Sequence, residues 1–225
     1  RSAPVLGTTA GAGAALDSTG AASQPVKVWP GLVFRACGTA IRRSSVMMAP
    51  IIPSHAMNTE QPMGILACQP LTAHAFSPYG EVLDLFAPDH QSINQGTSGR
   101  LDLPAELDLG GNQGQAVLAV FHALAQNPEG PCHMLERHQH GSQTFVPLTG
   151  ARCRVLVALG QDQPDLRTLR CFEVTGQQGF TLHKGTWHHP LMALDNGAFL
   201  VLERQGPTED CEIHSLPLSV RLSPL

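Results

Sequence analysis

The chain has 225 residues and a formal net charge of −4, with 14 Lys and Arg against 18 Asp and Glu. This balance provides no basic surface and argues against nucleic acid as a partner. The length suffices for one well-buried core. No run of about twenty apolar residues is found, so we expect no membrane partner and no transmembrane helix. Only 14% of the residues are charged, while 22 are Gly and 18 are Pro, which favours a turn-rich, all-β fold.

Residues 1–62 differ in composition from the rest of the chain. The chain begins with Arg1, and residues 7–23 are almost all Ala, Gly, Ser and Thr. Such a tract has too few large apolar side chains to offset the entropy of ordering it, which predicts a disordered extension. Two interpretations stay open: a targeting segment, or sequence upstream of a start at Met57 or Met63. The lack of an Arg-rich amphipathic pattern favours the second.

Residues 63–225 are expected to form a single all-β domain with a few short helices. A short helix is predicted at 72–76, a strand at 81–85, a polar loop that could contain one short strand at 89–114, and a strand at 115–123. Further short strands are predicted at 133–138, 143–147, 153–158, 169–174, 179–182, 190–194 and 198–202. Their close spacing is typical of a sandwich or barrel. Asn196-Gly197 predicts a hairpin, and Glu203-Arg204 is expected at the solvated edge of the final strand.

The cysteine pattern indicates reduced thiols. No CxxC pair occurs, which excludes zinc-ribbon and redox motifs, and a chain of this length needs no disulfide framework. We therefore expect mostly buried thiols in a cytoplasmic protein. The six cysteines are Cys37, Cys68, Cys132, Cys153, Cys171 and Cys211.

Histidines gather in two short segments, 133–140 and 183–189. Within the first, Glu136 and His138 alternate and would share one face of a strand, because side chains alternate with period two. Arg137 would then point to the opposite face and make a structural salt bridge or a dimer contact. Two such clusters on separate strands can converge on one metal ion or small substrate, so we interpret them as one site.

These segments resemble the two cupin motifs. Glu136-x-His138-x4-Gln143-x6-Gly150 is similar to the first, with Glu in place of its first His and Gln in place of its acidic ligand. His183-x-Gly185-x2-His188 is similar to the second, with His183 where cupins usually carry Pro. The resemblance implies a double-stranded β-barrel of the jelly-roll type, with these positions holding a divalent metal at its mouth.

A more specific resemblance, to the ureidoglycolate lyase family, covers residues 65 to about 217. The segments that carry it are PLTAHAFSPYGEVL, INQG, LERHQHGSQTFVPL, WHHPLMAL and DCEIHSLP. The resemblance implies a homodimer that splits (S)-ureidoglycolate into glyoxylate and urea during allantoin breakdown in purine metabolism. It also implies nickel or a similar divalent ion as the cofactor.

This reaction needs a base for the substrate hydroxyl and an acid for the departing urea nitrogen. Glu136, His138, Gln143 and His188 would hold the metal through two nitrogen and two oxygen atoms. Two alternatives stay open: Gln143 could instead hydrogen-bond a ligand, and Glu136 could be a free base.

Four further residues are expected to handle the substrate or its protons. His183 and Lys184 are candidate proton donors to the leaving nitrogen. Asn94, Lys184 and His189 are candidate substrate contacts, although His189 could simply shape the turn at Pro190 and Asn94 could be a solvated turn residue. The rival functions are another metal-dependent cupin enzyme (an amidohydrolase, isomerase or dioxygenase) and a non-enzymatic ligand-binding cupin.

Overall fold

The structure of the protein is a computed structural model that describes residues 64–225. The predicted extension at 1–62, and with it the alternative starts, lies outside the described residues. Within the described part, no helix is long and apolar enough to cross a membrane.

The described chain consists mainly of β-strands, with one short helix, α1 (Ala73–Phe76), and two 3-10 turns, η1 (Asn94–Gly96) and η2 (Gly111–Gln113). The strands are β1 (Ile65–Pro70), β2 (Gly80–Asp84), β3 (Gln91–Ile93), β4 (Ser98–Arg100), β5 (Gln115–Ala123), β6 (Cys132–His138), β7 (Gln143–Pro147), β8 (Cys153–Leu159), β9 (Asp165–Val174), β10 (Gln178–Leu182), β11 (Trp187–His188), β12 (Met192–Ala193), β13 (Gly197–Gln205) and β14 (Cys211–Ser223). This confirms the predicted all-β class.

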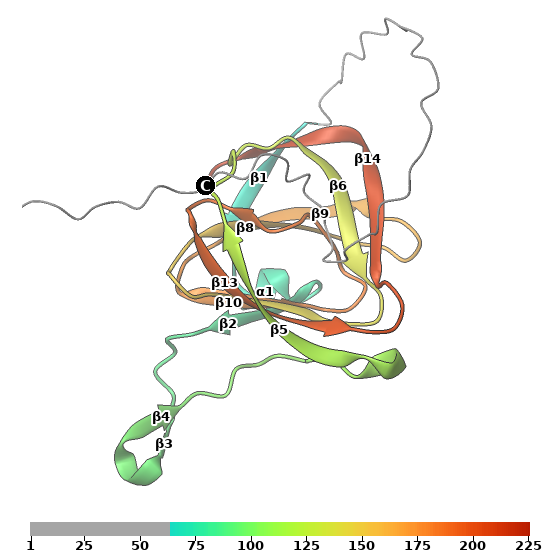
Figure 1. Cartoon of the computed structure of the whole chain (residues 1–225). Helices are drawn as coiled ribbons and strands as arrows, with labels where there is room; N and C mark the ends of the chain where they lie inside the picture. The colour runs from blue at the N-terminus through green and yellow to red at the C-terminus, as the bar shows by residue number, and fades with distance from the viewer. Residues whose placement is uncertain (1–63) are drawn as a thin grey trace, which may run out of the picture. The chain divides into compact units, whose positions relative to one another are not determined.

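Two large sheets form the fold (Figure 1). The seven-stranded sheet has the order β11-β6-β14-β1-β9-β8-β12, and an added pairing of β11 with β8 closes six of its strands into a ring. The five-stranded sheet has the order β2-β10-β7-β13-β5, and a separate β3–β4 hairpin extends away from both sheets. Among the described strands, only β1 pairs in parallel, with β14 and β9.

Strand β8 separates two hydrophobic cores. Its residues Val155 and Val157 belong to a core that takes members from both sheets and so lies between them. Leu156 and Ala158 belong to a second core, whose members come from the six ring strands and from β12, so it fills the ring. Because successive side chains of a strand point to opposite faces, a strand buried on both sides must be apolar almost throughout, as β8 is.

Helix α1 closes one end of the first core. Thr72 caps it by accepting a hydrogen bond from the backbone N–H of Ala75, as Thr commonly does at a helix N-terminus. Phe76, which is fully buried, packs edge-on against Phe172 with ring centroids 5.3 Å apart. The predicted helix at 72–76 is therefore confirmed.

Two topological predictions were wrong. Asn196-Gly197 does not close a hairpin, because β12 lies in the seven-stranded sheet and β13 in the five-stranded one; instead, Asn196 Oδ1 accepts the backbone N–H of Ala125 at 2.8 Å. The strand that ends at Gln205 is not the last, since β14 follows it. The predicted loop at 89–114 contains two short strands, β3 and β4, where one was expected.

The cysteines agree with the sequence analysis where they are described. Four are buried free thiols, Cys68, Cys132, Cys153 and Cys171, and Cys211 is partly exposed. Cys37 lies outside the described residues.

Candidate metal centre

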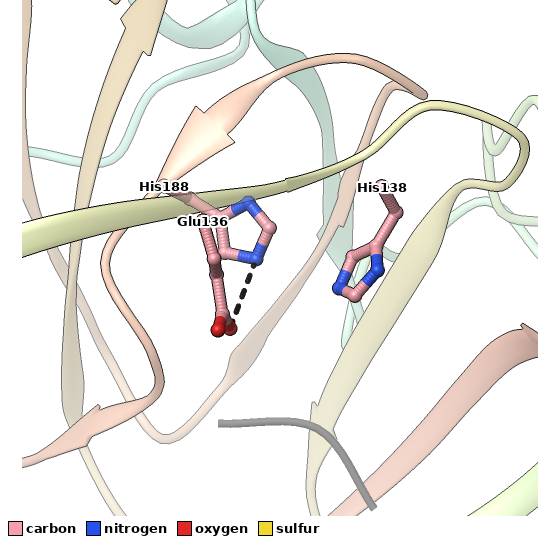
Figure 2. Close-up of side chains that lie close together, drawn as sticks. All are labelled: Glu136, His138 and His188. Atoms are coloured by element: carbon pink, nitrogen blue, oxygen red, sulfur yellow. Dashed lines mark ion pairs between the residues drawn. The ribbon is translucent and has the colours of Figure 1, made fainter. Parts of the chain in front are cut away.

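Three potential metal ligands meet where β6 and β11 pair. His188 on β11 is the register partner of Glu136 on β6, and His138 lies two residues further along β6 on the same face, as the alternation predicts. The ligand atoms of these three residues all lie within 4.8 Å of one another. The three side chains converge in Figure 2, where the imidazoles of His138 and His188 have ring centroids 5.5 Å apart.

The cluster faces the space between the two sheets. His188 lines a small cavity with Phe145, Phe180 and Leu182 of the first core, whereas its neighbour Trp187 points into the ring core. The exposed fractions of His188 and Glu136 are 3% and 7%. The site is therefore largely withdrawn from water, which strengthens electrostatic interactions within it.

Hydrogen bonds fix the tautomer of both imidazoles. Nδ1 of His138 lies 3.2 Å from the carbonyl oxygen of Asp210, and Nδ1 of His188 lies 3.0 Å from that of Thr186. A carbonyl oxygen can only accept, so each Nδ1 carries the proton and each Nε2 presents a lone pair. Both Nε2 atoms are buried without a hydrogen-bond partner among the described residues. Metal-binding histidines are commonly oriented in this way.

His188 is neutral in this arrangement. Burial lowers its pKa to about 3, with His138 contributing further. Its Nε2 lies 3.6 Å from Oε1 of Glu136, which is too long for a hydrogen bond. The lone pair on Nε2 of His188 and those on Oε1 of Glu136 therefore do not take part in a hydrogen bond with each other.

Glu136 has an unusual environment for a carboxyl group. Burial raises its pKa to about 7; a hydrogen bond from Cys211 lowers it, and the charge of Glu203 raises it. The Cys211 thiol lies 3.7 Å from Oε2 of Glu136. A buried carboxylate of this kind is stabilised by a nearby cation, so a metal ion would favour its charged form.

Gln143 faces the same space from the five-stranded sheet. Its Nε2 donates to Oε2 of Glu203 at 2.8 Å, and the two residues are register partners on β7 and β13. Its Oε1 is buried without a hydrogen-bond partner among the described residues. The amide is therefore oriented so that its carbonyl oxygen is free.

The donor atoms fit a divalent metal ion. Two unpartnered imidazole nitrogens and a carboxylate come from the cluster. Nitrogen and oxygen donors in this mixture suit a borderline divalent ion, and each buried polar atom without a partner is costly unless a ligand satisfies it.

His183 and Lys184 are not brought to the cluster. Nε2 of His183 lies 2.6 Å from Oε1 of Glu81, and Lys184 forms an ion pair with Asp108. Both line a separate cavity of about 490 Å³ to which none of the three cluster residues contributes.

The remaining predicted substrate contacts lie in different places. Asn94 is an exposed residue of η1 between β3 and β4, where its Nδ2 lies 3.5 Å from Oγ of Ser98. His189 is partly buried next to the cluster, and its Nδ1 lies 2.9 Å from the carbonyl oxygen of Pro190. Burial lowers the pKa of His189. His189 is thus close to the cluster and Asn94 belongs to a separate hairpin.

Arg137 points away from the cluster, as expected from strand alternation. It forms an ion pair with Glu212, and its guanidinium carbon lies 4.5 Å from the centroid of the Trp187 ring. The predicted structural salt bridge is confirmed.

Several residues that shape the site were missed in the sequence analysis. Glu203 is half-buried and holds Gln143, whereas its neighbour Arg204 is buried and donates to the carbonyl oxygens of Gly111 and Asn112. The expectation of a solvated edge at this pair was wrong, because loop 108–113 crosses it. Thr186, whose carbonyl oxygen orients His188, lies only two residues before it in the sequence. Asp210, whose carbonyl oxygen orients His138, lies more than seventy residues away from that histidine.

The family model and the sequence relatives name the same family. The family model described as "Ureidoglycolate lyase" matches residues 63–223. A ureidoglycolate lyase of Pseudomonas syringae pv. tomato is 36% identical over 161 residues, covering 71% of this chain and 95% of that protein. One from Azotobacter vinelandii is 39% identical over 153 residues, covering 68% and 92%. A solved structure titled as a 3,4-ketoisomerase from Helicobacter canadensis is 15% identical, with a TM-score of 0.35 over 59% of this chain and 89% of that one.

Proposed function

The chain belongs to the ureidoglycolate lyase family, and we propose that it splits (S)-ureidoglycolate into glyoxylate and urea. Its family membership supports this activity. The observation that carries the mechanism is the cluster of Glu136, His138 and His188, with its unpartnered imidazole nitrogens.

The substrate carries a hydroxyl, a carboxylate and the urea nitrogen on one carbon. In the proposed elimination a base removes the hydroxyl proton, and the oxygen electrons form the carbonyl of glyoxylate. The bond from carbon to nitrogen breaks, its electron pair stays on the nitrogen, and an acid protonates the departing urea. No water is consumed, so the reaction differs from hydrolysis of the ureido carbonyl.

We assign Glu136, His138, Gln143 and His188 as ligands of a divalent metal, with nickel suggested by the family resemblance. Such an ion, when bound, would supply Lewis acidity that lowers the pKa of the substrate hydroxyl. The fixed tautomers of His138 and His188 leave the lone pair of each Nε2 atom available to bind the ion. The hydrogen bond that Gln143 donates to Glu203 leaves the side-chain carbonyl oxygen of Gln143 available to bind the ion.

Glu136 has a second proposed role. As a carboxylate, the form that a bound metal ion would favour, it could accept the proton of the substrate hydroxyl. His183 and Lys184 are the proposed acids for the leaving nitrogen, with Lys184 and His189 as substrate contacts and Asn94 as a further one. Since His183 and Lys184 line another cavity, substitutions at these two positions are the decisive test of their part in the proposal.

The family resemblance also supports a homodimer in the cytoplasm. Light scattering on the purified chain tests the dimer directly, because a monomer would give half the expected mass. This part of the proposal is independent of the chemistry.

A single assay tests the reaction itself. The purified protein is incubated with ureidoglycolate, and glyoxylate, urea and ammonia are measured together, with the His188→Ala variant as the control. Equal amounts of glyoxylate and urea support elimination. Ammonia released in place of urea would identify an amidohydrolase and overturn the proposal.

A further inference from the structure

Two buried cysteines face each other across the pairing of β1 with β9. Cys68 and Cys171 are register partners on these parallel strands, and both side chains belong to the hydrophobic core that fills the ring. Neighbouring strands of a sheet lie about 4.8 Å apart, which is within the range of Cα separations found in disulfides. The two Sγ atoms lie 2.6 Å apart, against about 2.0 Å in a disulfide bond. The backbone therefore holds these two free thiols where a bond between them needs little movement.

The other two buried cysteines are placed differently. Cys132 belongs to the same core, and Cys153 belongs to the core between the sheets. Burial raises the pKa of each of these thiols to about 12, so both stay protonated near neutral pH. In the pair, the hydrogen bond between the thiols lowers the pKa of Cys68 and raises that of Cys171, and the charge of Arg154 lowers both. Cys68 is therefore the thiol of the ring core that most readily forms a thiolate, which is the reactive form.

Strand β1 links two parts of the ring through few register pairs. It lies between β14 and β9 in the order of the sheet. Residues 65–67 pair with β14, and residues 68–70 pair with β9. A covalent bond between Cys68 and Cys171 would fix β1 to β9 at the residue where its pairing changes from one neighbour to the other.

We propose that Cys68 and Cys171 form a reversible disulfide when the protein meets a peroxide, and that this bond fixes β1 in the ring. The pair is thus a redox-sensitive modification site within the fold. The inference does not depend on the proposed function, because neither cysteine belongs to the metal cluster.

The oxidation follows the usual chemistry of thiols, with hydrogen peroxide as the oxidant. The Cys68 thiolate attacks one peroxide oxygen, the O–O bond breaks, and the departing hydroxide takes up a proton to give water. The sulfur of Cys171 then attacks the resulting sulfenic acid, the S–O bond breaks, and hydroxide leaves with the Cys171 thiol proton as a second water. Two thiols lose two electrons in total, and one peroxide is reduced to two waters.

Peptide mapping of the purified full chain tests the inference. Trypsin would place each of the six cysteines in a different peptide, with Cys68 in residues 44–100 and Cys171 in residues 171–184. The protein is treated with hydrogen peroxide, unfolded, blocked with N-ethylmaleimide and digested without reduction. We expect these two peptides to appear joined, with the loss of two hydrogen atoms, and to separate again after dithiothreitol.

Variants and unfolding measurements locate the bond and its effect. Cys171→Ala should prevent the link and leave Cys68 as a sulfenic acid that dimedone traps, whereas Cys132→Ala, in the same core, should leave the link intact. The oxidised chain should unfold at a urea concentration about 1 M higher than the reduced chain, because the bond closes a loop of about 100 residues. That shift should be absent in Cys171→Ala. If this variant fails to fold, the peptide map and the urea midpoints of the unmodified protein decide.

Three results would overturn the proposal. The first is a link between any other two cysteine peptides or between two chains, and the second is peroxide treatment that leaves this pair reduced. The third is a disulfide at Cys68 and Cys171 that forms without raising the urea midpoint, because such a bond would not fix β1 in the ring.

Discussion

Gln143 donates its amide N–H to Oε2 of Glu203 across the β7–β13 pairing, at 2.8 Å. This contact determines which end of the amide faces the site, because Nε2 is engaged and Oε1 is buried without a partner among the described residues. An unsatisfied buried acceptor costs about 1–3 kcal/mol. A metal ion at the cluster would remove that cost if Gln143 is a ligand, so Glu203 is expected to orient Gln143 for binding.

Replacing Glu203 tests this relationship. Glu203→Ala frees the Gln143 amide to rotate, and metal affinity should fall by roughly 10- to 100-fold, the usual effect of losing a residue that orients a ligand. Glu203→Gln keeps an acceptor oxygen and should stay closer to the unmodified protein. Metal content after dialysis against a graded chelator measures both. Equal affinities of the two variants would show that the contact does not orient a ligand.

Removing either imidazole should abolish the metal site. We expect His138→Ala and His188→Ala to lose bound metal and to lower turnover by about two orders of magnitude or more, because each removes a principal ligand. Circular dichroism should stay unchanged. His133→Ala, at an exposed position of the same strand, is the matched control. Full metal occupancy in either site variant would show that the ligand set is wrong.

The sequence predicted the elements better than their partners. Periodicity predicted β5, β7 and β8 within a residue, because each has a clear apolar pattern. It gave no information on which strands pair, so Asn196-Gly197 was interpreted as a hairpin although the strands on either side enter different sheets. β14 was missed, since its mixed polar and apolar residues and Pro217 give a weak strand signal.

The site was predictable where its residues are close in sequence. Glu136 and His138 alternate on one strand, and the second histidine segment suggested His188. Glu203 could not be assigned in the same way, because it reaches Gln143 only through the register of β7 and β13, 60 residues apart. A half-buried carboxylate near the end of a strand has the same local sequence as a solvated one. Tertiary pairing, which the sequence pattern does not encode, determines the difference.

Deleting residues 1–56 should leave the fold and activity intact. The small-residue tract within this segment cannot contribute much to a core, and the family match begins only at residue 63. The truncated and full chains should unfold in urea with the same midpoint and slope, and they should have the same turnover. A lower midpoint in the truncated chain would show that the segment contributes to the folded domain.

The ion pair between Arg137 and Glu212 should make stability depend on pH in acid. The Arg137 guanidinium, followed by the Gln139 amide, lowers the pKa of Glu212 by hydrogen bonding to its carboxylate. Glu212 therefore binds a proton less readily in the folded state than in the unfolded chain, where the pKa of a Glu carboxyl group is about 4.3. The stabilising contribution is fully present above that value and is lost as pH falls through the lower folded pKa. Urea midpoints measured from about pH 6 to pH 3 should fall less steeply in Glu212→Gln, which has no proton to gain. Parallel curves for the two proteins would show that the pair contributes nothing to this dependence.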